Sequence, residues 1–193
     1  MIHTLKNQGI SKYNLGGTAP TLPDGERVLV VGQVEDDASI RLGAGELFTN
    51  RELLENARAA RPDAVLIYKP HPDVVSGLRT GDFDASGIAD LVLPDADISA
   101  LLGEISELWT MTSLTGFEAL LRGVHVVTTG APFYAGWGLT QDLGDVPPRR
   151  RAQVSLAGLV HAALIDYPRY FDPKTGLACP VEVAIKRLAE GGI

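Results

Sequence analysis

Five short apolar runs alternate with segments of helical spacing, and this alternation constrains the fold of the chain more than any other feature. Each run is apolar at consecutive positions, which is typical of a strand buried on both faces of a sheet. Strands that alternate with helices build a parallel sheet with helices on both faces, so the sequence predicts an α/β fold. The runs span residues 28–32, 64–68, 89–93, 107–111 and 124–128.

The segments between the runs carry recognisable helix starts and ends. Thr49 and Glu52 have the spacing of a capping box, and the apolar stripe after them predicts a helix that ends at Arg61–Asp63. A second helix is predicted over Ser113–Arg122, where Gly123 provides a C-terminal stop. Further helices are expected at 98–102, 155–164 and 180–188, the last with Pro180 at its first position.

Two stretches lack such periodicity. Residues 1–27 are broken by paired glycines and by prolines, so we expect a linker or an extended lead-in before a domain at 28–193. Residues 130–148 are rich in glycine, proline and aromatic side chains and predict a long loop. Loops of this length inside a compact domain are often functional.

Composition and charge exclude several classes of protein. The chain has 24 acidic and 17 basic side chains, a formal net charge of −7, which disfavours binding to nucleic acid phosphates. Its single cysteine, Cys179, excludes an internal disulfide and a zinc site built from cysteines. No apolar run approaches the ~20 residues of a membrane span, and Met1–Lys12 lacks the apolar stretch of a secretory signal. We therefore expect a cytoplasmic domain that binds no nucleic acid.

Residues that follow the strands are the informative ones, since ligands of parallel sheets bind beyond the carboxyl ends of the strands. Three acids, Glu35, Asp36 and Asp37, follow the first predicted strand. One interpretation is a solvated turn in which an aspartate caps a helix. The other is a carboxylate that acts as nucleophile, base or metal ligand, and the position at a strand end favours this functional interpretation.

A histidine between two prolines follows the second strand. Pro70 and Pro72 fix the backbone on both sides of His71 and so restrict the direction of its imidazole. A histidine held in this way beside Lys69 suits a phosphate or a carboxylate of a ligand. The alternative, a loop histidine bonded to the backbone, is less favoured at a strand end.

Hydroxyl side chains follow the fourth strand at a predicted helix start. Thr112, Ser113 and Thr115 stand beside Gly116, and free amides together with the positive end of the helix dipole favour an anion there. Simple capping of the helix by Thr112 or Ser113 is compatible with the same pattern. Glu118 lies on the first turns of this helix, where it either reaches nucleoside hydroxyls or favours the dipole.

The loop after the fifth strand combines glycines with aromatic residues. Gly136, Trp137 and Gly138 would let a flat or sugar-like group approach the backbone, whereas the structural alternative is an apolar lid on the sheet. The basic run Arg149–Arg151 is either a solvated surface or a means of steering an anion. Together the strand ends favour a sugar-nucleotide pocket. The sequence lacks the glycine motifs of NAD sites and P-loops and the Gly-x-Ser-x-Gly motif of hydrolases at the expected places.

Several of these segments, taken in order, resemble the bacterial capsule polysaccharide biosynthesis/export family. Members are retaining β-Kdo glycosyltransferases that use CMP-Kdo to build the Kdo linker between a capsule and its lipid. The resemblance implies a GT-B enzyme, of which this chain would be the nucleotide-binding C-terminal half, a Rossmann-like parallel sheet with helices on both faces. The similar segments are 33–40, 69–72, 112–120 and 131–138, with 167–173 and 179–182 near the end of the family's module.

The resemblance also implies roles for single residues. Asp37 matches the aspartate of a Gln-x-x-x-Asp pattern and would be the nucleophile, with Asp36 as the alternative. His71 would contact the phosphate or carboxylate of the donor, Ser113 and the amides after it would hold the CMP phosphate, and Glu118 would bind the ribose. No cofactor and no bound metal are expected. The full predicted binding set is Gln33, Lys69, His71, Pro72, Thr112, Ser113, Leu114, Thr115, Gly116, Glu118, Gly136, Trp137 and Gly138.

The length of the chain limits what it is expected to do alone. A GT-B domain needs on the order of 150–200 residues, so the chain suffices for one of two domains. A missing N-terminal half would contact a glycolipid acceptor and supply the general acid, at the inner face of the cytoplasmic membrane in the full enzyme, and its absence would favour self-association. Two alternatives remain: a non-catalytic nucleotide-sugar-binding or assembly module of the capsule machinery, and an epimerase-like GT-B relative.

Overall fold

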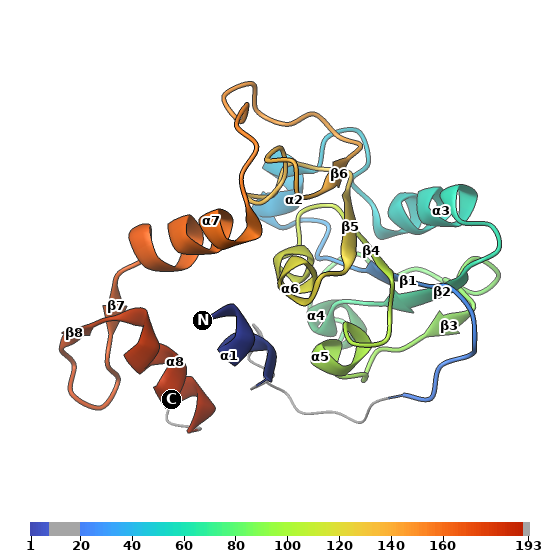
Figure 1. Ribbon diagram of the computed structural model, residues 1–193. Coiled ribbons are helices and arrows are strands. Elements are labelled where there is room, and N and C mark those ends of the chain that lie inside the picture. Colours follow the sequence, from blue (N-terminus) through green and yellow to red (C-terminus); the bar gives the residue numbers. More distant parts are fainter. Residues whose placement is uncertain (8–19, 191–193) are drawn as a thin grey trace. The chain divides into compact units, whose positions relative to one another are not determined.

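The computed structural model describes residues 1–7 and 20–190 (Figure 1). The chain divides into two compact units, one spanning Leu15–Gln153 and one combining Met1–Asn14 with Val154–Ile193. The first unit contains the main sheet and every residue of the predicted site. The division after Gln153 was not anticipated from the sequence, and the single domain at 28–193 stays a prediction.

The main sheet has six strands, all parallel, in the order β3-β2-β1-β4-β5-β6. The chain moves from β1 to one side of the sheet and from β4 to the other, which is the Rossmann-like arrangement. The predicted α/β fold with a parallel sheet is thereby confirmed. The strands are β1 (Arg27–Val31), β2 (Val65–Lys69), β3 (Leu91–Val92), β4 (Glu107–Thr110), β5 (His125–Thr128) and β6 (Gln141–Asp142).

Alternation along the strands supplies apolar side chains to both faces of this sheet. Val30 and Trp109 belong to a buried cluster that includes the apolar stripe of α3 (Asn50–Ala60). Leu29, the neighbour of Val30, is fully buried and points to the opposite face. There α6 (Thr115–Arg122) packs against β4 and β5, so the sheet lies between α3 and α6 (Figure 1).

The two longer helices of the first unit contain the predicted capping box and the predicted C-terminal glycine. Thr49 Oγ1 accepts the N–H of Glu52 at 3.2 Å, and Glu52 Oε2 accepts the N–H of Thr49 at 3.1 Å, which completes the capping box of α3. α6 ends at Gly123, whose φ of +79° lies in the left-handed region that favours glycine. Three short helices are α2 (Ala38–Gly43), α4 (Pro72–Val75) and α5 (Ile98–Leu101).

Two predictions about the first unit are wrong in detail. The loop expected at 130–148 contains β6, whose two residues pair with Val127 and Thr128 of β5. A polar pair of this kind carries no strand signal in the sequence, because its pairing is decided by β5. The helix expected from Ser113 begins at Thr115, since Ser113 closes the turn that precedes it.

The second unit is built from short elements, and several of them, the strands β7 and β8 included, differ from expectation. The predicted lead-in contains α1 (Ile2–Asn7), whereas Gly16 and Gly17 lie outside the described residues. The helix expected at 155–164 continues beyond α7 as a π-helix, and Pro180 is the N-cap of α8 rather than its first residue. The elements are α7 (Leu156–His161), η1 (Ala162–Asp166), β7 (Tyr170–Phe171), β8 (Ala178–Cys179) and α8 (Val181–Ala189), with β7 and β8 antiparallel.

An ion pair holds the β7–β8 hairpin of the second unit against α8. The guanidinium of Arg187 donates to both carboxylate oxygens of Asp172, at 2.9 and 3.0 Å, and Asp172 is 5% exposed. These hydrogen bonds lower the pKa of Asp172 to about 2.

Within residues 1–7 and 20–190, no helix has both the length and the apolar composition that crossing a membrane requires.

Candidate functional site

The carboxyl ends of β1 and β4 lie side by side at the centre of the sheet. Val30 of β1 is in register with Trp109 of β4, while β2 flanks β1 on one side and β5 flanks β4 on the other. Chains that leave two neighbouring strands in opposite directions open a crevice there, where parallel sheets bind ligands. The segments after β1, β2, β4 and β5 therefore form the candidate site.

Gln33 joins the two central strand ends through its side chain. Its Oε1 accepts hydrogen bonds from Thr110 Oγ1 at 3.1 Å and from the N–H of Thr112 at 2.9 Å. Its Nε2 donates to Thr112 Oγ1 at 2.9 Å. The residue is 7% exposed, so these bonds form in a largely dry setting. The structure thus brings together two residues of the predicted set, Gln33 and Thr112. The Gln33 amide connects the end of β1 to the end of β4.

The acids after β1 have separate partners. Glu35 Oε1 accepts the N–H of Asn50, the first residue of α3, at 2.8 Å. Asp36 Oδ1 accepts from the guanidinium of Arg79 at 3.0 Å and from the Thr80 hydroxyl at 3.1 Å. The hydrogen bond from Arg79 holds the pKa of Asp36 below its ordinary value. Asp36 is therefore engaged in an ion pair.

Asp37, the third of these acids, caps a helix. Its Oδ1 accepts the N–H of Ser39 at 2.8 Å, which makes Asp37 the N-cap of α2. Its own N–H donates to the carbonyl of Val34 at 3.1 Å and closes the acidic turn. Asp37 is an exposed residue. The capping interpretation is realised, and it is compatible with the functional one because the cap holds an exposed carboxylate in one orientation.

His71 and Lys69, the predicted ligand-binding residues at the end of β2, have different hydrogen-bond partners. His71 is the N-cap of α4 and Pro72 its first residue; His71 Nδ1 accepts the N–H of Asp73 at 3.2 Å. This hydrogen bond assigns the proton of a neutral imidazole to Nε2. Lys69 Nζ donates to the carbonyl of Pro94 at 2.8 Å, and burial lowers the pKa of Lys69.

Predicted phosphate ligands gather at the start of α6, where they bond to one another. The N–H of Ser113 donates to Thr110 Oγ1 at 3.0 Å, and the N–H of Thr115 donates to Ser113 Oγ at 3.2 Å. The N–H of Gly116 donates to the Ser113 carbonyl at 3.1 Å. Leu114, the N-cap, is exposed and gives α6 no side-chain cap. The hydroxyls therefore lie at the helix start, but the amides of Ser113, Thr115 and Gly116, expected to be free, have partners within the turn.

Gly116 lies against a buried tyrosine. A Cβ at Gly116 would collide with the hydroxyl of Tyr134, which donates a hydrogen bond to the Ser113 carbonyl. Burial raises the pKa of Tyr134. Glu118 follows in the first turn of α6 and is 7% exposed. Gly116 thus has a packing reason to be glycine, besides the predicted role in ligand binding.

The side chains of Asp142 and Arg150 hold the loop after β5 through hydrogen bonds to its backbone. Asp142 Oδ2 accepts the N–H of Gly136 at 2.9 Å, and Gly136 and Gly138 have φ of +82° and +80°. The guanidinium of Arg150 lies 5.9 Å from the centre of the Trp137 ring and donates to backbone carbonyls of the same loop. The predicted Gly136–Gly138 segment is thus a folded loop whose indole contacts a cation.

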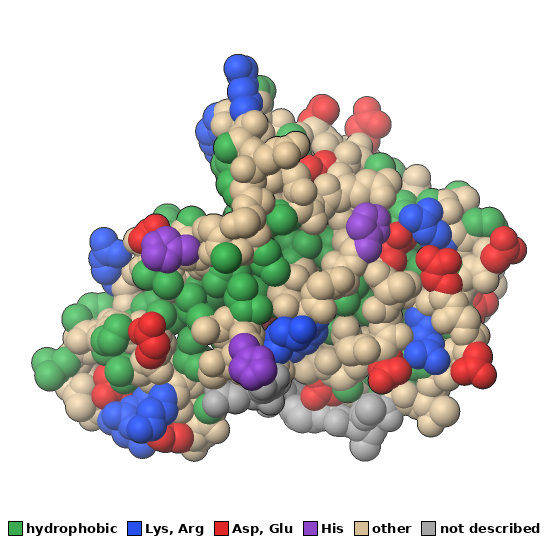
Figure 2. Space-filling model, viewed as in Figure 1, with side chains coloured by type: hydrophobic (Ala, Val, Ile, Leu, Met, Phe, Trp, Pro, Cys, Tyr) green, Lys and Arg blue, Asp and Glu red, His purple; other side chains and the backbone are tan. Residues whose placement is uncertain are grey.

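Basic side chains lie on the loop that follows β6. Arg149 and Arg151 are exposed, whereas Arg150 is half-buried. Figure 2 shows Lys and Arg side chains projecting at the tip of the loop that follows β6. On a chain with a net charge of −7, such a local group favours approach of an anion to this part of the first unit.

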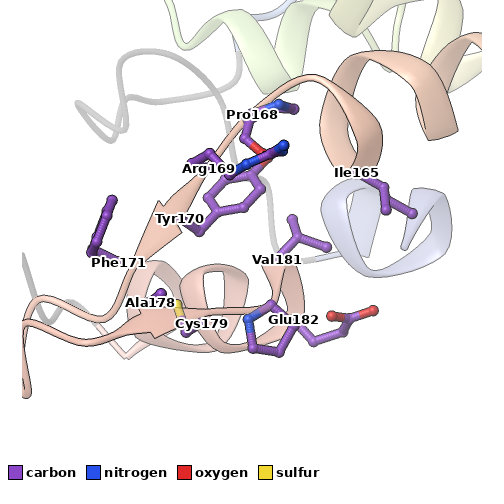
Figure 3. Close-up of a pocket in the computed structure, with 10 residues that line it drawn as sticks. Ile165, Pro168, Arg169, Tyr170, Phe171, Ala178, Cys179, Val181 and Glu182 are labelled. Carbon is purple, nitrogen blue, oxygen red and sulfur yellow. The ribbon is translucent and has the colours of Figure 1, made fainter.

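A pocket of about 340 Å³ lies in the second unit, and no residue of the predicted site lines it. Figure 3 shows that its lining comes from η1, the β7–β8 hairpin and the start of α8. Its surroundings are mostly apolar. The lining residues are Ile165, Pro168, Arg169, Tyr170, Phe171, Ala178, Cys179, Pro180, Val181 and Glu182.

Sequence reasoning missed four residues that shape the site. Asn50 and Arg79 act through partners 17 and 43 positions away, and Asp142 acts through Gly136 and Thr128, six and 14 positions away. No local pattern marks the three residues. Tyr134 stood in the aromatic loop already singled out, so its composition offered a signal.

Across the part of the chain that the structure describes, no three His, Cys, Asp or Glu side chains are grouped to hold a metal ion.

Curated relatives share most of this chain. It is 51% identical over 189 residues to the capsule polysaccharide modification protein LipA of Neisseria meningitidis serogroup A, covering 95% of this chain and 27% of LipA. It is 45% identical over 188 residues to the lipopolysaccharide-processing protein LpsZ of Rhizobium meliloti, covering 94% of this chain and 42% of LpsZ. The chain therefore spans between a quarter and a half of the length of these relatives.

Solved structures and a family match agree with these relatives. Two Thermosulfurimonas dismutans KpsC structures, a beta Kdo 2,7 transferase and a beta Kdo 2,4 transferase, are 35% and 34% identical to this chain, with TM-scores of 0.83 and 0.88. They are matched over 100% and 97% of this chain and 60% of their own length. Residues 16–170 match the family described as capsule polysaccharide biosynthesis protein. The resemblance seen in the sequence is confirmed, and this chain belongs to the capsule polysaccharide biosynthesis protein family.

Proposed function

We propose that this chain is the donor-binding part of a glycosyltransferase that transfers Kdo from CMP-Kdo, with retention, to a lipid-linked capsule acceptor. One observation carries the proposal: Asp37, His71 and Ser113 follow β1, β2 and β4, which are neighbours in the sheet. The likeness to two Kdo transferases at 34–35% identity supports the same reaction class.

The start of α6 is the proposed phosphate site. Its eight residues begin without a side-chain cap, and the Ser113 hydroxyl and the Thr115 N–H lie at this end. A phosphate would replace their mutual hydrogen bond with stronger charge-assisted ones, and the helix dipole favours the negative charge. His71, whose neutral form carries its proton on Nε2, would donate to the phosphate or to the Kdo carboxylate, and Lys69 would add positive charge.

Asp37 is the proposed nucleophile. Asp36 is the weaker choice because Arg79 and Thr80 occupy its Oδ1. An oxygen of Asp37 would bond to the anomeric carbon while the bond from that carbon to the phosphate oxygen breaks, with its electron pair leaving on CMP. The acceptor hydroxyl would then displace the carboxylate and give its proton to a base. Two inversions yield retention.

The remaining parts of the reaction are proposed to lie outside this chain. The curated relatives and the solved KpsC chains are longer than the segment matched here. We propose that their additional sequence corresponds to the half that contacts the glycolipid acceptor and supplies the general acid. Glu118 is proposed to bind the ribose, and Gly136–Gly138 to lie against the donor.

Calorimetric titration of CMP tests the binding step. The wild-type chain should bind CMP, and His71→Gln should weaken binding about tenfold, the usual cost of losing one hydrogen bond to a charged group. His125→Gln is the matched control, because His125 is the first residue of β5. It therefore lies at the amino ends of the strands, away from the carboxyl ends that form the candidate site. Equal affinities of the two variants would contradict the role of His71, and no binding to wild type would contradict the function.

Intact-protein mass spectrometry after incubation with CMP-Kdo tests the covalent step. We expect a mass increase of one Kdo in the wild-type chain and none in Asp37→Asn. Asp36→Asn is the matched control and should retain the adduct. An adduct that persists in Asp37→Asn would remove Asp37 as nucleophile.

A second function remains in view because the chain covers 27% to 60% of its relatives. In that case it is a nucleotide-sugar-binding or assembly module without catalysis. CMP binding with no adduct and no transfer to any acceptor would favour this alternative.

A further inference from the structure

Asn50 is fully buried although it is a polar residue on the first turn of α3. Each polar atom of its side chain has a partner: Oδ1 accepts the N–H of Gln33 at 2.8 Å, and Nδ2 donates to the Gln33 carbonyl at 2.8 Å and to the Gly81 carbonyl at 3.0 Å. A buried amide costs free energy unless it is satisfied in this way. The side chain therefore binds both the N–H and the carbonyl of Gln33, as a neighbouring strand would.

The same contacts fix the acidic turn that follows Gln33. The Asn50 N–H donates to Glu35 Oε1 at 2.8 Å, and the Glu35 N–H donates to the Thr80 carbonyl at 3.2 Å. The turn ends at Asp37, whose N–H donates to Val34. Asn50 thus bonds through its side chain to Gln33, just before the turn, and through its backbone N–H to Glu35, two residues before Asp37.

The fit around Asn50 is tight on the side of residue 81. A Cβ at Gly81 would lie 2.7 Å from Asn50 Nδ2 and 3.0 Å from the Gln33 carbonyl oxygen, and its φ of +124° also favours glycine. Asn50 and Gly81 therefore pack closely around the Gln33 carbonyl, and the Gln33 side chain links the turn to Thr112.

We propose that Asn50 is a positioning residue that sets the Asp37 carboxylate relative to the Thr112–Ser113 turn. The proposal rests on the function proposed above, in which Asp37 attacks the donor. Asn50 itself touches no reacting atom; its side chain acts through the Gln33 backbone, while the bond from its backbone N–H to Glu35 is kept in any variant. Its loss should therefore slow the step at Asp37 more than it weakens CMP binding at the start of α6.

The test compares Asn50→Asp with Asn56→Asp in the 193-residue chain. Asp at position 50 keeps the acceptor for the Gln33 N–H but sets an oxygen against the carbonyls of Gln33 and Gly81. Asn56 is an exposed residue of the same helix whose Nδ2 donates to the Glu52 carbonyl, so its variant controls for the chemical change. Adduct formation with CMP-Kdo and CMP affinity are measured for each.

We expect the rate of adduct formation to fall at least about tenfold in Asn50→Asp, with the CMP Kd raised less than about threefold. Asn56→Asp should match wild type. An adduct rate in Asn50→Asp within about twofold of wild type would overturn the proposal, as would a parallel loss of rate and affinity, the mark of a structural role. Should Asn50→Asp fail to fold, Asn50→Ser decides by the same criteria. A wild-type chain that binds no CMP and gains no Kdo would instead overturn the proposed function, and this proposal with it.

Discussion

Gln33 and Thr112 are joined by two hydrogen bonds, each 2.9 Å long: the backbone N–H of Thr112 donates to Gln33 Oε1, and Gln33 Nε2 donates to the Thr112 hydroxyl. The two residues are 79 positions apart and follow the adjacent strands β1 and β4. A single side chain thus joins the two central strand ends beside which we place the donor.

Replacing Gln33 by Met should destabilise the first unit and weaken CMP binding. The thioether keeps the volume but leaves the Thr110 hydroxyl and the Thr112 N–H without their acceptor, which costs about 1–3 kcal/mol. Urea denaturation gives the free energy of unfolding, and calorimetry gives the CMP Kd. Gln141→Met, at an exposed position of β6, should stay within about 0.5 kcal/mol of wild type. Equal stability of the two variants would contradict the bridging task of Gln33.

Gly116→Ala should destabilise the protein by about 1–3 kcal/mol, because the added methyl group collides with the Tyr134 hydroxyl and lies 2.7 Å from its Cζ. Thermal unfolding measures the effect. In Gly158→Ala the methyl group meets its nearest neighbour, Ser155 Oγ, at 3.4 Å, so this variant of α7 should be neutral or more stable.

A double variant identifies the collision. With Tyr134→Phe already in place, the cost of Gly116→Ala should fall but not vanish, because the ring carbon remains close while the hydroxyl is gone. A double-mutant cycle of unfolding free energies measures this coupling. Strict additivity would show that Tyr134 is not the obstacle.

Glu107 should make stability depend on pH in the acidic range. Burial raises the pKa of Glu107, but hydrogen bonds from Trp109, Arg61 and His125 outweigh burial and leave the pKa below its ordinary value. A carboxyl with a lowered folded-state pKa stabilises the protein above its unfolded-state pKa, and this contribution is lost as the pH falls through the folded-state pKa.

Urea midpoints measured from about pH 6 to pH 3 check this expectation. Below about pH 4.5 the wild-type midpoint should fall more steeply than that of Glu107→Gln, which has no such group to protonate. Glu107→Gln should be less stable by about 1–2 kcal/mol at neutral pH, since hydrogen bonds to a charged acceptor are the stronger ones. Glu46→Gln, at an exposed position, is the control and should leave the acid slope unchanged. Parallel curves for wild type and Glu107→Gln would refute the prediction.

Removing Arg187 should return the pKa of Asp172 from about 2 toward ~3.9. Since that pKa is lowered in the folded state, the contribution of the pair to stability is complete above about pH 4 and is lost as the pH falls toward 2. Titration of the Asp172 carboxyl by NMR in wild type and Arg187→Ala measures the change. Lys186→Ala, a neighbouring cation of α8, should leave the Asp172 pKa in place.

Local signals were the part of the fold that could be predicted from the sequence. Thr49 and Glu52 interact within one turn, and Gly123 adopts its left-handed conformation for reasons confined to the helix end. Such contacts join residues three or four positions apart, so spacing alone reveals them. Strand β6 escaped because two polar residues form a strand only where β5 offers them a partner.

The sequence by itself determined that the chain is an α/β protein of the capsule biosynthesis family, because buried parallel strands and family motifs are written in consecutive residues. Only the tertiary structure decided which acid pairs with Arg79, which caps α2, and that Gln33 spans from β1 to β4. It also decided that Asn50, an ordinary polar residue in the sequence, is buried against Gln33. Apart from the cap of α2, these tasks depend on contacts between residues 15 to 79 positions apart, which the order of strands in the sheet creates and no local pattern encodes.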